Sequence, residues 1–242
     1  MASFPSGPFV TTAAITTRML RRVHLVRPGR IEYGQALALQ AEAAQRCRTT
    51  GQETLFLLEH QPVYTLGRNA DPREILFAPE RRRELGISLF ETDRGGRATY
   101  HGPGQLVGYP ILNLSPDRCD VKRYVRDLEE TIIRTLADFG IQGTRSPLKE
   151  RVTSVWIGND KIAAIGVHIS RWITTHGFAL NVTTNLDHFF GIVPCGILDG
   201  GVTSMERVLK RVIPMEEVEG TYRVRFAEVF GRDTTAPFAG RS

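Results

Sequence analysis

The 242-residue sequence predicts a mixed α/β (α+β) fold, in which helices interrupt a series of strands. Short apolar runs bounded by turn residues predict the strands, and two of these runs flank a tight turn typical of a hairpin. Longer stretches with apolar residues on one face predict amphipathic helices. Because hairpins and helices alternate along the chain, we expect a mixed sheet with helices packed against it.

The first half of the chain is expected to contain one long helix and several short strands. A stretch rich in Ala, Leu and Gln follows Gly29 and predicts a helix over residues 31–48, with Gly51 at its end. Residues 69–86 are charged and contain two prolines, so we expect them to leave the sheet. Pro110 indicates that its strand lies at an edge or contains a bulge. Strands are predicted over residues 54–59, 63–66, 87–92 and 105–114, and a short helix over residues 80–85.

The second half begins with the clearest helix of the sequence, which Asp120 caps and Gly140 ends. Its predicted buried face contains Val121, Tyr124, Val125, Leu128, Ile132, Leu136 and Phe139. The turn Gly158-Asn159-Asp160 predicts a hairpin. A last helix over residues 215–230 would bury Met215, Val218, Tyr222, Phe226 and Val229. Further strands are predicted over residues 152–157, 161–170 and 173–182, followed by a short helix over 186–190 and a loop over 194–196.

The composition restricts the class of protein. The sequence contains 31 basic and 26 acidic residues, a formal net charge of +5, which indicates a generally basic surface or, alternatively, attraction to an acidic partner. No basic run is interleaved with aromatic residues and no stretch approaches the roughly 20 apolar residues of a membrane helix, so neither nucleic acid nor membrane is expected as a partner. Cys47, Cys119 and Cys195 form no C-x-x-C pair and the six histidines form no ligand motif, so no disulfide framework and no metal site are expected. A reducing, cytoplasmic location is expected from this cysteine usage.

The ends of the chain are expected to lie outside the main domain. Residues 1–22 contain no acidic residue and include three arginines. This composition is compatible with a flexible basic N-terminus, or with a transit peptide for an organellar matrix. No repeat or linker divides the rest of the chain, so we expect one domain over residues 23–232 and a tail over residues 233–242.

Two side chains are candidates for chemistry. Cys195 lies between Pro194 and Gly196, where proline fixes the backbone and glycine leaves room for a ligand, so its thiolate could attack an acyl carbonyl. Lys161 opens a strand after a tight turn, and an amine near a thiol can accept its proton. From the residues alone, an inert buried cysteine and a solvated hairpin lysine remain the alternatives.

A glycine-rich segment over residues 94–110 could expose backbone amides to an anion or a carbonyl. It lacks the P-loop and dinucleotide-binding patterns, and a bend between strands remains the alternative. Within it, His101 could be a base, an orienting group or a loop histidine. His176-Gly177 repeats the His-Gly pair inside an apolar strand, where glycine often marks the close approach of a ligand.

Taken together, these segments resemble the lipoate-protein ligase B family, the octanoyl-[acyl-carrier-protein]:protein N-octanoyltransferases. The matching stretches occur in family order and cover residues 57–68, 94–111, 155–170, 175–182 and 192–205. The resemblance implies a biotin/lipoate-protein ligase-like fold. It does not cover the N-terminus, and Ser154 stands where the family pattern usually has glycine.

The resemblance also implies the roles of individual residues. Cys195 would form an acyl thioester, and Lys161 would lower the pKa of its thiol. Gly166 and Gly177 are expected to widen the acyl tunnel. The residues implied to line the acyl substrate are Arg94, Gly95, Gly96, Arg97, Ala98, Thr99, Tyr100, His101, Ala164, Ile165, Gly166, Gly177, Phe178 and Ala179.

The implied reaction transfers an octanoyl group from octanoyl-acyl carrier protein to a lysine of a lipoyl domain, without a cofactor or metal. Expected acceptors are the lipoyl domains of 2-oxoacid dehydrogenase complexes and the glycine-cleavage H protein, and a monomer is expected. The alternative enzyme is an ATP-dependent lipoate or biotin ligase of the same fold. A thioesterase and a non-catalytic carrier-binding module are further alternatives.

Overall fold

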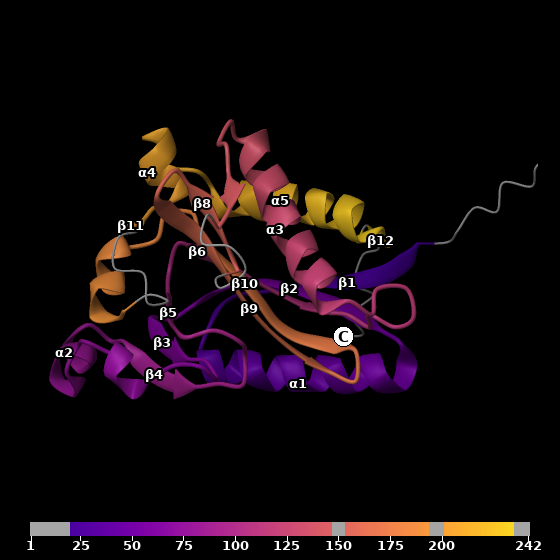
Figure 1. The fold of residues 1–242 in the computed structure, drawn as a ribbon, viewed down its shortest axis with the longest axis horizontal. Helices are drawn as coiled ribbons and strands as arrows, with labels where there is room; N and C mark the ends of the chain where they lie inside the picture. Colours follow the sequence, from indigo (N-terminus) through magenta and orange to yellow (C-terminus); the bar gives the residue numbers. More distant parts are fainter. Residues whose placement is uncertain (1–19, 147–152, 194–200, 235–242) are drawn as a thin grey trace, which may run out of the picture.

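The computed structural model describes residues 20–146, 153–193 and 201–234, and within them two sheets with helices on both sides (Figure 1). The larger sheet has the order β12-β1-β2-β6-β10-β9-β8-β7, and β11 pairs with β9. Its strands are β1 (Arg21–Ile31), β2 (Glu53–His60), β6 (Gln105–Ile111), β7 (Thr144–Arg145), β8 (Ser154–Ile157), β9 (Asp160–Ser170), β10 (Ile173–Asn181), β11 (Gly201–Val202) and β12 (Arg232–Asp233). The smaller sheet, β4-β3-β5, consists of β3 (Val63–Leu66), β4 (Ser88–Glu91) and β5 (Ala98–His101).

Helices cover both faces of the larger sheet. On one face, α3 (Val121–Asp138) and α5 (Met215–Phe230) bury apolar side chains against β2, β6 and β10. On the other face, α1 (Tyr33–Thr50) packs small side chains against the same strands, as Figure 1 shows. The remaining helical elements are α2 (Pro79–Glu84), α4 (Met205–Leu209) and the 3₁₀ turns Pro72–Glu74 and Leu186–Gly191. The expected mixed sheet flanked by helices is therefore confirmed.

The long helices follow their sequence signals. In α3 the Asp120 side chain accepts a hydrogen bond from the N–H of Arg123, and α1 ends at Gly51, whose φ is 74°. Val121 is 46% exposed, so the predicted buried face of α3 is wrong in its first turn. In α5, Phe230 is buried in the core while Val229 is only partly buried.

The expectation that Pro110 marks an edge strand or a bulge is wrong. Strand β6 lies between β2 and β10, and its pairing with β2 runs through Pro110 without a register shift. The irregularity appears in β10 instead. The β6–β10 ladder covers Gly108–Phe178 to Gln105–Asn181, and beyond it His176 adopts a φ of 57°. The His176 N–H donates to Gln40 Oε1 at 2.7 Å, and the Thr174 hydroxyl donates to the Pro110 carbonyl at 2.6 Å. Side chains thus replace the ladder bonds where proline interrupts the pairing.

Strand β1 was not expected from the sequence, since it is rich in arginine and contains Pro28-Gly29. It pairs in parallel with both β2 and β12, and its register shifts between Val26 and Gly29. The strand begins inside the segment 1–22 that was expected to be flexible, and β12 extends one residue into the expected tail. A buried ion pair between Arg232 and Glu53, 2.7 Å long, ties this edge of the sheet together.

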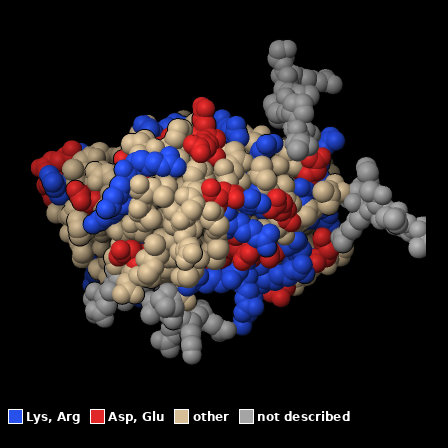
Figure 2. Space-filling view, turned by 90° about the horizontal axis from the view of Figure 1, so that it is seen from above, with Lys and Arg blue, Asp and Glu red and all other residues tan. Residues whose placement is uncertain are grey.

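Two surface properties bear on possible partners. None of the helices in the described ranges is long and apolar enough to cross a membrane. Figure 2 shows the face that carries α3 and α5, where Lys and Arg side chains are interspersed with Asp and Glu. Basic and acidic side chains are therefore mixed on this face.

Candidate active site

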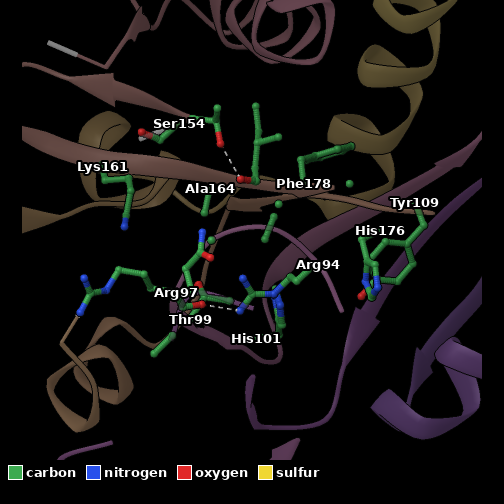
Figure 3. Close-up of a pocket in the computed structure, with 18 of the residues that line it drawn as sticks. Arg94, Arg97, Thr99, His101, Tyr109, Ser154, Lys161, Ala164, His176 and Phe178 are labelled. Carbon is green, nitrogen blue, oxygen red and sulfur yellow. Dashed lines mark hydrogen bonds between the residues drawn. The ribbon is translucent and has the colours of Figure 1, made fainter. Parts of the chain in front are cut away.

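A cavity of about 360 Å³ lies between the larger sheet and the smaller one. Its floor comes from β9 and β10, and its roof is the loop over residues 92–97, which we call the roof loop, with β5 behind it. In Figure 3, Lys161 and Arg97 lie toward one end, and Tyr109 and His176 toward the other. The expected site residues that line the cavity are Arg94, Gly96, Arg97, Ala98, Thr99, His101, Lys161, Ala164, Ile165, Gly166, Gly177, Phe178 and Ala179.

Two of the expected site residues, Gly95 and Tyr100, do not line the cavity. The N–H of Gly95 donates to the carbonyl of Val167 at 2.9 Å, behind the wall. Tyr100 is buried, and its hydroxyl lies 2.7 Å from His188 Nδ1. Cys195 lies outside the described residues, as does the loop predicted around it. The cavity residues that were not assigned from the sequence are Tyr33, Asn69, Tyr109, Thr153, Ser154 and His176.

The two floor glycines line the cavity, and neither position has room for a side chain. A Cβ at Gly166 would lie 2.8 Å from the Gly95 carbonyl oxygen of the roof loop. A Cβ at Gly177 would lie 2.1 Å from the Gly108 carbonyl oxygen in β6. Both glycines therefore allow backbones to approach closely, and Gly166 brings the roof down onto the floor.

Lys161 is the second residue of β9 and is only 5% exposed. Within the part of the chain that the structure describes, its ammonium makes no hydrogen bond, and it points into the cavity (Figure 3). Its backbone is fixed, because Val202 of β11 is its strand partner and the Thr203 N–H donates to its carbonyl at 3.0 Å. A buried amine with unused donors can serve a reacting group that enters the cavity.

The Arg94 guanidinium ties the roof loop to the smaller sheet. It donates to the Thr65 carbonyl at 2.8 Å, to the Thr65 hydroxyl at 2.7 Å and to the Arg97 carbonyl at 2.8 Å. Arg94 is only 7% exposed, and its guanidinium donates to acceptors within the protein. Its role is therefore to hold the roof loop against the smaller sheet.

Glu74 anchors the other end of the roof loop. Its carboxylate pairs with the Arg97 guanidinium at 2.6 Å and accepts the Ala98 N–H at 3.0 Å. Burial raises the pKa of the Glu74 carboxyl, but the N–H groups of Asp71 and Ala98 and the charge of Arg97 outweigh it, so the pKa is lowered. The carboxylate therefore stays ionised and holds the loop at neutral pH.

A buried chain of hydrogen bonds fixes the state of His101. Gln105 Nε2 donates to Asn181 Oδ1 at 2.9 Å, so Gln105 Oε1 is the acceptor for His101 Nδ1–H at 2.8 Å. Burial, with the nearby His60 and Arg94, lowers the pKa of His101 well below its usual value. His101 is thus a neutral imidazole with a lone pair on Nε2. Asn181 Nδ2 donates to the carbonyl of Thr203. The N–H of Thr203 in turn donates to the backbone carbonyl of Lys161, so the chain of hydrogen bonds ends at Lys161.

His60 lies behind the cavity wall and is also held neutral. Its Nδ1–H donates to the Ile31 carbonyl at 3.2 Å, and its Nε2 accepts from the Tyr109 hydroxyl at 2.7 Å. Burial lowers the pKa of His60 to about 4. Tyr33 packs against it, with ring centroids 5.2 Å apart. This wall is therefore aromatic and uncharged.

The state of His60 predicts how stability depends on pH. The unfolded chain binds a proton at His60 below about pH 6.5, whereas the folded chain resists protonation until about pH 4. The free energy of unfolding should therefore fall as pH drops through this window, by about 3 kcal/mol from His60. The pKa values of His101 and His176 are lowered too, which adds to the fall.

Urea unfolding at pH 7 and pH 4.5 measures this loss, and His60→Gln is the matched variant because an amide keeps one hydrogen bond. We expect the variant to lose less stability between the two pH values than the wild type. Equal losses in the two proteins would show that His60 is not held neutral.

Comparisons with known proteins find related sequences over most of the chain. Residues 32–227 match the family model of the lipoyl protein ligase A/B catalytic domain. An octanoyltransferase from Caldicellulosiruptor bescii is 47% identical over 206 residues, which cover 84% of this chain and 90% of that relative. One from Solibacter usitatus is 50% identical over 212 residues, 87% of this chain and 94% of the relative. One from Myxococcus xanthus is 50% identical over 218 residues, 87% of this chain but 60% of that longer relative.

Solved structures share the fold at low sequence identity. A lipoate-protein ligase A bound with ATP superposes with a TM-score of 0.73 and 19% identity, over 90% of this chain and 89% of that one. A bi-partite lipoate protein ligase from Thermoplasma acidophilum gives a TM-score of 0.70 and 19% identity, over 90% and 87% of the two chains. The overall architecture is thus common to these proteins.

Proposed function

The chain belongs to the lipoyl protein ligase A/B catalytic domain family, and on that premise we propose that it transfers octanoyl groups in protein lipoylation. Octanoyltransferases from several bacteria are about half identical to it over most of its length. It is therefore an acyltransferase, and the cavity is the place for its acyl group. The observation that carries this proposal is the buried amine of Lys161 beside a cavity with a largely apolar floor.

The proposed donor is an octanoyl thioester on acyl carrier protein. The proposed acceptor is a lysine of a lipoyl domain, such as those of 2-oxoacid dehydrogenase complexes or the H protein. Six methylenes of the acyl chain, at about 0.8 kcal/mol each, provide about 5 kcal/mol of binding when they leave water. The apolar floor of β9 and β10 supplies the surface on which they would be buried.

In the first step, Lys161 takes the thiol proton of Cys195, and the thiolate attacks the carbonyl carbon of the donor thioester. The bond from that carbon to the carrier sulfur breaks. The carrier thiolate takes the proton from Lys161 and leaves, so the octanoyl group is now bound to Cys195 and Lys161 is a neutral amine.

In the second step, the acceptor lysine attacks the thioester on Cys195. Its amine has an ordinary pKa near 10.4, so it must be neutral when it attacks. Lys161 removes the proton that the attacking nitrogen releases, and Cys195 leaves as a thiolate. This restores the thiolate and ammonium pair, and an amide replaces a thioester without ATP.

Support for the pairing of Cys195 with Lys161 comes from the described residues on either side of the 194–200 segment. Before it, the Val193 N–H donates to the Glu74 carbonyl at 2.8 Å, and Glu74 holds the roof loop. After it, Val202 pairs with Lys161 itself. The described residues on both sides of Cys195 are thus bonded to residues that hold the candidate site.

A transfer assay tests the proposed function. The chain is mixed with octanoyl-acyl carrier protein and a lipoyl domain without ATP, and the mass of the lipoyl domain is followed. We expect one octanoyl group to be added to the domain. Transfer only from free octanoate with ATP would instead identify a ligase, and release of octanoate with no lipoyl domain present would identify a thioesterase.

A further inference from the structure

One carboxylate joins the roof loop to the floor of the cavity. Asp93 Oδ1 lies 2.8 Å from His176 Nε2, and Asp93 Oδ2 bonds to His168 Nδ1. The two histidines belong to neighbouring strands, since His168 is in β9 and His176 is in β10. Asp93 therefore bridges two floor strands from the first turn of the roof loop.

The backbone of β10 is distorted at His176, one of the two histidines of this bridge. His176 has a φ of 57°, in the left-handed region that costs a non-glycine residue free energy. It lies where Pro110 interrupts the ladder, and its N–H is held by Gln40 Oε1. The conformation is thus supported from α1 on one side and by Asp93 on the other.

The other anchors of the roof loop lie on the opposite side. Arg94 binds Thr65 of β3, and Arg97 binds Glu74. Hydrogen bonds from the roof loop to the floor are made by Asp93, which binds His168 and His176, and by the nearby Gly95 N–H, which donates to the Val167 carbonyl at 2.9 Å. Without the carboxylate, the roof would stay attached to the smaller sheet but lose a bridge to β9 and β10.

We propose that Asp93 is a positioning residue that fixes the distance between roof loop and floor, and thereby the fit of the cavity to the acyl chain. This rests on the proposed function, because it assigns the cavity to an acyl group. Asp93 touches no reacting atom in this account. Burial raises the pKa of its carboxyl, but the bonds to His176 and His168 outweigh it, so the pKa is lowered and Asp93 accepts these bonds as a carboxylate at neutral pH.

The test compares Asp93→Ala with Asp93→Asn, whose amide can accept from His176 and donate to His168. Asp138→Ala is the matched control, because Asp138 makes a similar two-bond bridge to Arg225 between α3 and α5, away from the cavity. The readouts are KM and kcat for octanoyl-acyl carrier protein, and amide hydrogen exchange of residues 92–98.

We expect Asp93→Ala to raise KM about tenfold with kcat within about threefold, and to speed exchange in the roof loop. Asp93→Asn and Asp138→Ala should stay within about twofold of the wild type in KM. His168→Ala, which removes one half of the bridge, should raise KM about threefold. If Asp93→Ala does not fold, His168→Ala still tests the proposal.

Unchanged exchange in the roof loop of Asp93→Ala and His168→Ala would overturn the proposal. So would faster exchange with unchanged KM, or a fall in kcat at constant KM. A wild-type chain that transfers no octanoyl group would contradict the proposed function, and the exchange measurement would still decide whether Asp93 holds the roof.

Discussion

Replacing Cys195 with alanine is expected to lower the rate of octanoyl transfer by at least about 10⁴-fold, because the covalent route is lost. Initial rates with saturating octanoyl-acyl carrier protein and lipoyl domain measure this loss. Cys195→Ser tests the same point, since a serine hydroxyl is a far weaker nucleophile beside a lysine than a thiolate.

Cys119→Ser is the matched control for this loss. Cys119 is exposed and does not line the cavity, and Cys47 lies on the buried face of α1. We expect the control to keep full activity. If Cys195→Ala retained transfer within about tenfold of the wild type, the thioester intermediate would be wrong, whatever the fate of the other cysteines.

The second large effect is expected from Lys161→Ala, which should lower transfer by about 10²- to 10⁴-fold through loss of the proton carrier. It should also raise the pH needed to alkylate Cys195 with iodoacetamide, because the neighbouring positive charge stabilises the thiolate. Folding is not expected to suffer, since Lys161 is 5% exposed and removing its ammonium removes a cost of burial.

Alkylation of Cys195 is measured as a function of pH by peptide mass spectrometry in the wild type, in Lys161→Ala and in Lys122→Ala. Lys122 is an exposed lysine of α3, so its removal changes the net charge equally. We expect the alkylation profile to move to higher pH in Lys161→Ala alone. Identical profiles in the three proteins would remove Lys161 from its assigned role.

Elements with a local signal could be predicted from the sequence. The cap and apolar stripe of α3, the length of α5 and the turn before β9 are all encoded within a few residues. Strand β1 has no such signal. Its arginines and Pro28-Gly29 suggest a loop, and it becomes a strand because β2 and β12 offer parallel partners from distant parts of the chain.

Some residues of the candidate site could be predicted from local motifs, and others come together only in the folded chain. Motif-like segments pointed to Lys161, the roof loop and the floor strands, which do line one cavity. Tyr33 and Tyr109 could not be predicted as cavity residues, because α1 and β6 bring them there only in the folded chain. The bridge from Asp93 to His168 and His176 likewise joins residues 75 and 83 positions apart, a spacing that no sequence pattern indicates.

The most direct measurement is intact mass spectrometry of the chain after mixing with octanoyl-acyl carrier protein, with no acceptor present. We expect one octanoyl group to be added, the adduct to map to Cys195, and the added mass to disappear when a lipoyl domain is supplied. Transfer to the lipoyl domain without any adduct, or with an adduct at another residue, would contradict the covalent mechanism.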